Sequence, residues 1–489
     1  MMNDIEKFVE YIIDSNTNFQ DIDRIYLINR IKGLVGDDTT SDSHTVDPLK
    51  IRDALVLDAV NNGRIPDTPG DRERTGDRIM DFATPIPSAV NEFFWNLYSN
   101  DPEMATNYFY TLCCKNDYVK TSAIKKNISY TSPTNFGDIE ITINLSKPEK
   151  DPKAIAAAKD NVSNNYPKCQ LCMENEGYQG RPGYPSRANH RIIRFQLGGE
   201  TWGFQYSPYA YFKEHAIFLS EKHEPMVINQ HTFANLLDIV KLFPQYFVGS
   251  NADLPIVGGS MLSHEHYQGG RHTFPMMNAP IEKVIDVGDS GVTAGIVKWP
   301  LSTIRLQSKN TDKLITAATK IHDTWKDYSN ENVDVRAYTN NVRHHTTTPI
   351  AYKKDDMYVL DIVLRDNQTS QQYPDGIFHP HQDVQHIKQE NIGLIEVMGR
   401  AILPPRLKPE LHEVEKYLLD EPNNIAKYHQ VWADEIKQNN NIKKDNVEEI
   451  VDNQVAKVFA RVLEDAGVFK WNEAGQAAFT KFTDLLKED

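Results

Sequence analysis

The sequence predicts an α+β protein in which a helical N-terminal region precedes two related halves built of antiparallel strands and helices. Three observations carry this prediction. Apolar residues recur at three- and four-residue spacing in residues 5–13 and 25–34, as on one face of a helix. From about residue 185 onward the chain instead shows alternating and short apolar runs, which are typical of strands. The order of strands, a His-x-His pair and a helix then occurs twice, which indicates the two halves.

The first predicted domain, residues 1–150, is expected to be mainly helical. Residues 92–118 show a helical period with many aromatic side chains. Residues 37–44 are polar and residues 71–78 are rich in charge, so both predict loops. Prolines at positions 148 and 152 predict a boundary at the end of this region.

The second predicted domain, residues 151–330, alternates strands and helices. Gly198-Gly199 separates the strand-like runs 191–197 and 201–206, which is typical of a hairpin. Further strands are expected at residues 215–220, 283–287, 292–299 and 303–307, and helices at residues 231–243 and 312–328.

The third predicted domain, residues 331–489, joins a second strand-rich half to C-terminal helices. Residues 348–352 and 357–364 predict a hairpin, because a polar Lys-Lys-Asp-Asp turn separates them. A helix is expected from about residue 389 to 402, ended by Pro404-Pro405. Amphipathic helices, for example residues 447–463, follow.

Composition excludes several classes of function. The chain is 40% hydrophobic and 25% charged, as in ordinary globular proteins, and its formal net charge is −15. That balance excludes a general nucleic-acid binder, which needs a surplus of Lys and Arg, but leaves room for a small anionic ligand. The N-terminus lacks the features of a signal peptide, and no run approaches the ~20 apolar residues of a membrane span. We therefore expect a cytoplasmic protein that binds neither nucleic acid nor membrane.

The segment Ser263–Gly270 carries the clearest chemical signal. In an extended strand His264, His266 and Gln268 would point to one face, because side chains alternate. A neutral imidazole can bind a metal or attack phosphorus, and a carboxamide can donate a hydrogen bond to phosphate. A polar outer face on an ordinary strand is the alternative, but the ordered trio favours a site.

The four cysteines fall into two pairs. Cys113 and Cys114 lie in an apolar, helical pattern and are expected to be buried, inert thiols. Cys169 and Cys172 form a Cys-x-x-Cys motif, whose spacing suits a tetrahedral metal ion. A redox pair and a purely structural pair stay open as alternatives. The turn-like surroundings favour metal over a redox pair, which should open a helix after a strand.

Together these motifs resemble the histidine triad superfamily, and more closely the family 2 galactose-1-phosphate uridylyltransferases of bacteria. The resemblance covers most of the chain from about Asp81 to Pro404 and rests on residues 167–178, 202–209, 246–260 and 390–399. It implies that the two halves are histidine-triad-like.

The resemblance implies a double displacement between UDP-glucose and galactose 1-phosphate. His266 matches the nucleophile that carries UMP as a phosphoramidate, and Gln268 matches the residue that hydrogen-bonds the transferred phosphate. The chemistry of the residues agrees, because covalent catalysis divides one transfer into two matched steps and aimed donors stabilise the transferred group.

The resemblance also implies a structural zinc site. Cys169, Cys172 and His264 match three ligands of zinc-binding relatives, and His223 matches the fourth. His215 competes with His223 for that place, and His223 is favoured. Two thiolates and two imidazoles close the coordination sphere, so the ion would have no catalytic position.

Three further residues are expected to contact substrate. Asn251 is assigned to the nucleotide, and Ser260 follows Gly258-Gly259 as a phosphate donor, with a plain turn as its alternative. Glu396 is carried over as a contact to hexose hydroxyls. A second metal would use Glu282, His379, His381 and either His344 or His345. A metal-free, histidine-rich pocket is favoured over it.

The leading hypothesis is therefore a UDP-glucose–hexose-1-phosphate uridylyltransferase that works through uridylyl-His266, with UDP-glucose and galactose 1-phosphate as its partners. The alternative is a dinucleoside polyphosphate phosphorylase or hydrolase of the same superfamily. A zinc-stabilised binding protein without catalysis is the third hypothesis. A homodimer is left open.

Overall fold

The computed structural model describes residues 2–38, 44–146, 165–259 and 261–487. The chain divides into two compact units, which are described separately. Unit 1 comprises Met1–Ala123, Lys147–Ala210 and Ala216–His223, and unit 2 comprises Ile124–Ser146, Tyr211–His215 and Glu224–Asp489.

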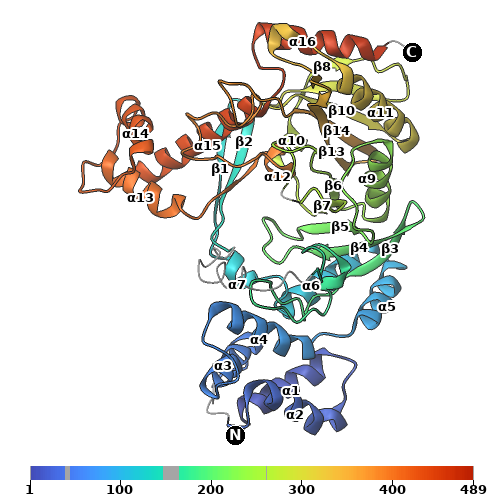
Figure 1. Cartoon of the computed structure of the whole chain (residues 1–489), viewed down its shortest axis with the longest axis vertical. Helices are drawn as coiled ribbons and strands as arrows, with labels where there is room; N and C mark the ends of the chain where they lie inside the picture. Colours follow the sequence, from blue (N-terminus) through green and yellow to red (C-terminus); the bar gives the residue numbers. More distant parts are fainter. Residues whose placement is uncertain (1, 39–43, 147–164, 260, 488–489) are drawn as a thin grey trace. The chain divides into compact units, whose positions relative to one another are not determined.

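The N-terminal part of unit 1 is helical, as predicted (Figure 1). Its elements are α1 (Asp4–Ser15), the 3-10 turn η1 (Asp21–Asp23), α2 (Arg24–Val35), α3 (Pro48–Asn61), α4 (Pro69–Phe82), α5 (Pro87–Tyr98) and α6 (Pro102–Lys115). Asn3 caps α1 with a capping box. Its side chain accepts a hydrogen bond from the amide of Glu6, and the Glu6 carboxylate accepts one from the amide of Asn3. The apolar faces of the first four helices bury Phe8, Leu27 and Leu55 in one core.

The loop predicted at residues 71–78 is wrong, because these residues lie within α4. Thr68 caps the helix by accepting from the amide of Asp71, and Pro69 occupies the first turn. Gly76 marks a close approach between helices, since a Cβ there would lie 2.9 Å from Cδ of Arg52. This glycine therefore serves packing and does not break the helix.

Unit 1 also holds the strands β3 (Ile193–Leu197), β4 (Glu200–Tyr206) and β5 (Ala216–Ser220), paired antiparallel in that order. The predicted hairpin is confirmed. Gly198 and Gly199 both have positive φ, +58° and +82°, which suits a tight two-residue turn. Helix α5 packs on β3, where Trp95 donates to the carbonyl of Arg194 at 3.0 Å.

Unit 2 is built on an antiparallel sheet with strand order β7-β6-β13-β14-β10-β9-β8. The strands are β6 (Phe247–Gly249), β7 (His266–Gly270), β8 (Ile281–Ile285), β9 (Thr293–Val297), β10 (Thr303–Ser308), β13 (His345–Lys354) and β14 (Met357–Asp366). The predicted hairpin of residues 348–364 is confirmed by the pairing of β13 with β14. A short separate ribbon joins β11 (Tyr338–Thr339) and β12 (Val342–Arg343).

Two helices cover this sheet, α9 (Gln230–Leu242) and α11 (Thr311–Asp327), and they also pack on each other (Figure 1). Both helices were predicted. Alternate residues of β13 and β14, among them Ile350, Val359 and Val363, join a separate apolar core with the C-terminal helices. Both faces of the sheet are thus covered, which explains why eight consecutive residues of β13 are buried.

A second sheet in unit 2 consists of β1 (Ile128–Thr134), β2 (Gly137–Ile143) and β15 (Arg400–Leu403), in the order β1-β2-β15. The first two strands lie in the region expected to be mainly helical. β15 runs parallel to β2 and pairs Ala401 with Ile141.

The long helix predicted at residues 389–402 is wrong. The structure has only a single turn there, α12 (Leu394–Val397), followed by β15. Gly399 ends the helix with φ +100°, and a Cβ at this position would lie 2.8 Å from Cη2 of Trp299. The apolar run after it pairs with β2 instead, so its hydrogen bonds come from a distant part of the chain.

The remaining elements are short turns and the C-terminal helices. They are α7 (Thr121–Ile124), η2 (Met173–Asn175), α10 (Pro275–Asn278), η3 (Glu331–Val333), α13 (Leu407–Leu418), α14 (Lys427–Asn439), α15 (Val447–Ala466), α16 (Glu473–Asp484) and η4 (Leu485–Lys487). The prediction of amphipathic helices after Arg406 is confirmed.

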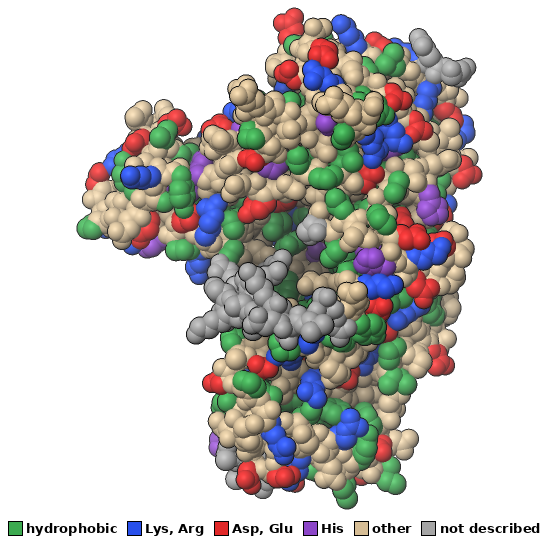
Figure 2. All heavy atoms as spheres, in the orientation of Figure 1, with side chains coloured by type: hydrophobic (Ala, Val, Ile, Leu, Met, Phe, Trp, Pro, Cys, Tyr) green, Lys and Arg blue, Asp and Glu red, His purple; other side chains and the backbone are tan. Residues whose placement is uncertain are grey.

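The distribution of charged side chains on the surface agrees with the expectation that the protein is not a general nucleic-acid binder. On the face drawn in Figure 2, acidic and basic side chains are interspersed, and this face carries no continuous basic area. Within the described ranges, no helix combines the length and apolar character that crossing a bilayer requires.

Candidate functional site

His266 opens strand β7, which pairs antiparallel with β6 through Gly249 opposite Gln268. His266 is buried, with 6% of its surface exposed. Only Tyr267 separates His266 from Gln268, so the alternation of the strand sends both side chains to one face, as predicted. His264 departs from the expectation, because it precedes the strand and lies in a bend.

The orientation of the His266 ring is set by its own backbone neighbourhood. Its Nδ1 lies 2.8 Å from the carbonyl oxygen of His264. A carbonyl can only accept, so Nδ1 carries the proton and donates, and Nε2 keeps its lone pair. Burial lowers the pKa of His266 to about 4, which keeps the imidazole neutral at neutral pH. The ring is therefore prepared as a nucleophile through Nε2.

Gln268 is held by a second histidine. Nε2 of His215 lies 2.9 Å from Oε1 of Gln268. His215 had been considered as an alternative metal ligand, but in unit 2 its ring is engaged with this carboxamide. No pattern in the sequence predicted the pair, since its members lie 53 positions apart in the chain.

The Cys-x-x-Cys motif lies in an irregular loop of unit 1 beside η2. Sγ of Cys172 lies 3.3 Å from Sγ of Cys169 and 3.1 Å from Nδ1 of His223. Neither cysteine is in a disulfide bond. Burial, and then the neighbouring Cys169, raise the pKa of Cys172 to about 12. A bound metal cation would oppose this effect, because it favours the thiolate form of Cys172.

His264 completes the candidate metal-binding group with Cys169, Cys172 and His223. It belongs to unit 2, where its side chain is fully buried. Two thiols and two imidazoles are the donor set that zinc prefers in closed structural sites. These are the four residues that the resemblance implied as metal ligands.

Two of the three predicted substrate contacts have protein partners. Oδ1 of Asn251 accepts from the amide of Leu394 at 2.9 Å, which holds the start of α12. Glu396 accepts from the amide of Gly393 at 3.0 Å, and its other oxygen lies 2.6 Å from Nζ of Lys388. Ser260 lies outside the described residues.

Lys388 is a residue that sequence reasoning missed. Only 4% of it is exposed, and the ion pair with Glu396 helps to raise its pKa against the opposing effect of burial. The sequence offers one signal, which is that Glu390 follows Lys388 by two positions. A carboxylate oxygen of Glu390 also lies 3.2 Å from the Lys388 ammonium. The Lys388 ammonium thus places a buried positive charge directly beside the Glu396 carboxylate.

The residues considered for a second metal do not form a cluster of ligands within the described part of unit 2. They instead have individual protein partners. His344 bonds Asn367, His345 bonds Asp366, His379 bonds Asn391 and His381 bonds the carbonyl of Ile377, while Glu282 is exposed on β8.

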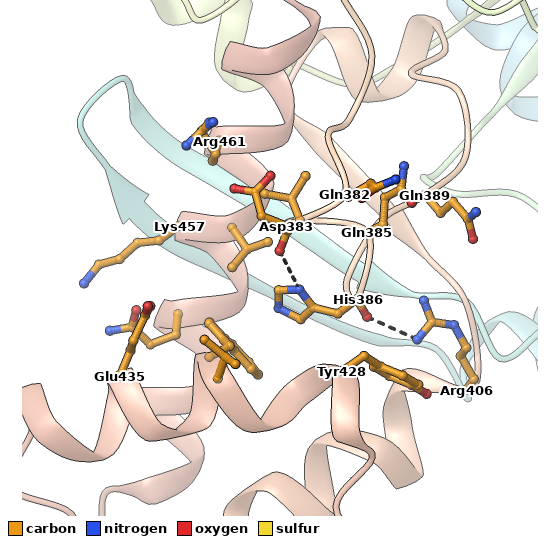
Figure 3. Close-up of a pocket in the computed structure, with 15 residues that line it drawn as sticks. Gln382, Asp383, Gln385, His386, Gln389, Arg406, Tyr428, Glu435, Lys457 and Arg461 are labelled. Atoms are coloured by element: carbon orange, nitrogen blue, oxygen red, sulfur yellow. Dashed lines mark hydrogen bonds between the residues drawn. The ribbon is translucent and has the colours of Figure 1, made fainter. Parts of the chain in front are cut away.

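A cavity of about 870 Å³ lies apart from these residues in unit 2 (Figure 3). It is bordered by the loop of residues 382–389 and by side chains of α14 and α15, such as Tyr428 and Lys457. His386 donates from Nδ1 to the carbonyl of Asp383 at 2.9 Å, and Arg406 donates to the carbonyl of His386. None of the predicted catalytic, substrate or metal residues lines it, so it carries no part of the candidate site.

Comparison with known families covers most of the chain. Residues 17–225 match the family model described as galactose-1-phosphate uridyl transferase, N-terminal domain, and residues 239–434 match the C-terminal domain of the same family.

Similar proteins extend over the full length. The galactose-1-phosphate uridylyltransferase of Pediococcus pentosaceus is 64% identical over 99% of this chain and 100% of its own length. That of Lactiplantibacillus plantarum is 63% identical over 100% of both chains, and that of Streptococcus thermophilus is 57% identical over 99% of both. Among solved structures, yeast Ap4A phosphorylase Apa2 in complex with Ap4A aligns with 10% identity over 75% of this chain and 97% of its own. Its TM-score is 0.41, and this likeness is too weak to support an inference.

Proposed function

Because the chain belongs to the galactose-1-phosphate uridylyltransferase family, we propose that it exchanges uridylate between two hexose 1-phosphates. UDP-glucose and galactose 1-phosphate are the proposed substrates, and glucose 1-phosphate and UDP-galactose the products. The names of the relatives support the acceptor, and their full-length similarity supports a common reaction.

The proposed reaction proceeds in two displacements. The Nε2 lone pair of His266 attacks the α-phosphorus of UDP-glucose, and the bond to the bridging oxygen breaks. Glucose 1-phosphate leaves with that oxygen, and UMP stays on the ring as a phosphoramidate. A phosphate oxygen of galactose 1-phosphate then attacks the same phosphorus, the P–N bond breaks, and UDP-galactose leaves.

The observation that carries this proposal is the hydrogen bond from Nδ1 of His266 to the carbonyl of His264. It assigns the lone pair to Nε2 and gives the positive charge that develops on the ring during attack a fixed acceptor. Gln268, on the same face of β7, is the proposed donor to a non-bridging oxygen of the transferred phosphate.

We also propose that Cys169, Cys172, His223 and His264 hold one zinc ion. The donor set supports this assignment, since two thiolates and two imidazoles fill a tetrahedral sphere and leave no position for substrate. Bound zinc would fix the backbone of His264, whose carbonyl orients the nucleophile. Its contribution would thus be structural.

We also propose that the protein acts on small molecules in the cytoplasm. The net charge of −15 favours small-molecule partners over nucleic acid, and four cysteines without a disulfide bond suit a reducing cytoplasm. Gel filtration would check the homodimer, which stays a prediction.

The decisive experiment uses UDP-glucose with radioactive phosphorus in the α position. The enzyme without acceptor should become labelled in acid-labile form, and added galactose 1-phosphate should remove the label as UDP-galactose. His322→Phe, a substitution of another buried histidine of unit 2, should still be labelled. Release of labelled UMP to water or inorganic phosphate, without transfer to the sugar phosphate, would instead favour the hydrolase or phosphorylase. An unlabelled, inactive protein would favour the binding-protein hypothesis.

A further inference from the structure

His215 is a buried histidine that neither the proposed nucleophile nor the proposed metal group uses. It lies in the segment Tyr211–His215 of unit 2, with 3% of its surface exposed. Its one described polar contact is the 2.9 Å hydrogen bond from Nε2 to Oε1 of Gln268. A buried histidine whose one described hydrogen bond goes to a carboxamide needs a physical explanation.

The explanation is that the two ends of a carboxamide have opposite hydrogen-bonding roles. One end of Gln268 accepts hydrogen bonds and the other donates them, and rotation by 180° exchanges the two ends. A phosphate oxygen needs a donor, so an amide presented with its oxygen outward would repel the group it should bind. With Oε1 engaged by His215, the NH₂ group of Gln268 is left to donate to the substrate.

The bond requires a proton on Nε2 of His215, because Oε1 can only accept. Nδ1 then carries a lone pair, and among the described residues it has no hydrogen-bond partner. The opposite tautomer would bury an unpaired N–H at Nδ1 and would require the carboxamide to rotate by 180°. It is therefore the less stable tautomer. Burial also lowers the pKa of His215 to about 4, which keeps a single proton on the ring at neutral pH.

Aromatic packing holds the ring of His215 in place. It stacks on Phe212 at 4.7 Å and 28°, and it contacts the ring of Tyr211 in a tilted arrangement at 5.5 Å and 31°. Phe212 in turn stacks on His272 at 5.4 Å, and His272 bonds Glu140 of β2 at 2.9 Å. The column thus links the position of His215 to a strand outside the main sheet.

We propose that His215 is a positioning residue that fixes the carboxamide of Gln268 with its N–H bonds toward the transferred phosphate. This inference rests on the proposed function and names a determinant of its uridylyl-transfer step. His215 touches neither substrate nor metal in this scheme, and it acts only through Gln268.

A double-mutant cycle tests the proposal in the full-length enzyme. His215→Phe keeps an aromatic ring and removes the donor, while His215→Gln restores an N–H close to the position of Nε2. The measured quantity is the single-turnover rate of uridylylation from UDP-glucose, together with KM and kcat. We expect His215→Phe to slow uridylylation about 10- to 100-fold, with KM changed by less than about threefold, and His215→Gln to recover most of the rate.

The coupling is the decisive outcome. In a Gln268→Ala background, His215→Phe should cause almost no further loss, because there is no carboxamide left to orient. An equal loss in both backgrounds would overturn the proposal. His322→Phe is the matched control, since His322 is equally buried and bonds only Thr347 in the described structure. It should lower the melting temperature without changing the uridylylation rate.

Two checks keep the outcomes separate. If wild-type enzyme forms no uridylyl intermediate, the proposed function fails, whatever the cycle shows. If wild-type enzyme is labelled and the cycle is additive, only the role of His215 fails. Should His215→Phe not fold, His215→Leu replaces it in the same cycle, with the same two outcomes.

Discussion

Nδ1 of His266 lies 2.8 Å from the carbonyl oxygen of His264, so the proposed metal ligand and the proposed nucleophile are joined through the backbone. The metal group would fix the peptide of His264, and that peptide would fix the tautomer of His266. This coupling explains why a structural ion could matter to catalysis without touching substrate.

Substitution of the nucleophile should abolish uridylyl transfer. His266→Asn is expected to lower kcat by about 10⁴-fold or more, since β7 carries no second histidine that could form the phosphoramidate. Intact-mass spectra after incubation with UDP-glucose would show a UMP adduct on wild-type enzyme and none on the variant. Turnover of His266→Asn near the wild-type rate would refute the mechanism.

Loss of the phosphate donor should have a smaller effect. Gln268→Ala is expected to slow uridylylation about 10²- to 10³-fold, because one donor to the developing charge disappears. Gln268→Glu should be slower still, since a carboxylate repels the phosphate. Stopped reactions with labelled UDP-glucose give both rates, and a Gln268→Ala enzyme as fast as wild type would remove Gln268 from the mechanism.

Metal removal should act on stability and activity together. A strong zinc chelator is expected to lower the melting temperature and to slow turnover, and added zinc should restore both. Cys172→Ser should lose the ion and destabilise the fold by about 4 kcal/mol. Cys114→Ser, in α6 outside the site, should keep one zinc per chain by elemental analysis. Full zinc content in Cys172→Ser would contradict the assigned ligands.

Removing one partner of the buried ion pair between Lys388 and Glu396 should destabilise the protein more than removing both. Their side chains are 5% and 9% exposed. Glu396→Gln should cost about 3 kcal/mol in the free energy of unfolding, because it leaves the ammonium buried without its main counter-charge. Lys388→Met combined with Glu396→Gln should recover part of this loss in urea unfolding. A raised KM for galactose 1-phosphate in the double variant would further support Glu396 as a hexose contact.

Asp452 of α15 predicts a pH-dependent stability. Burial raises its pKa to about 6 against the opposing effect of Tyr130, and the nearby Glu448 and Glu415 contribute to the rise. A raised carboxyl pKa means that the folded state binds the proton more tightly, so this contribution is present below about pH 4 and is lost as the pH rises through 6. Asp452→Asn should therefore be more stable than wild type at pH 7.5, by about 1–2 kcal/mol after allowance for partial solvent exposure. At pH 4 the two proteins should melt at the same temperature, and a constant difference across this range would exclude the assignment.

Several features were predictable from local sequence. The Gly198-Gly199 hairpin and helices α9 and α11 follow from turn chemistry and from apolar periodicity, and these depend on neighbouring residues alone. The common face of His266 and Gln268 follows from strand alternation in the same way. The four-residue metal group came from the resemblance, because spacing by itself suggested only the two cysteines.

Other features depend on contacts between distant residues. Gly399 ends α12 because Trp299 lies against it, and the run after it becomes a strand because β2 offers a free edge. Lys388 forms an ion pair with Glu396, and His215 forms a hydrogen bond with Gln268. Both contacts depend on tertiary packing that no local sequence pattern predicts. The sequence by itself determined which side chains could perform the chemistry. Only the tertiary structure decided which neighbours orient them, because those neighbours are brought together by burial across long separations of the chain.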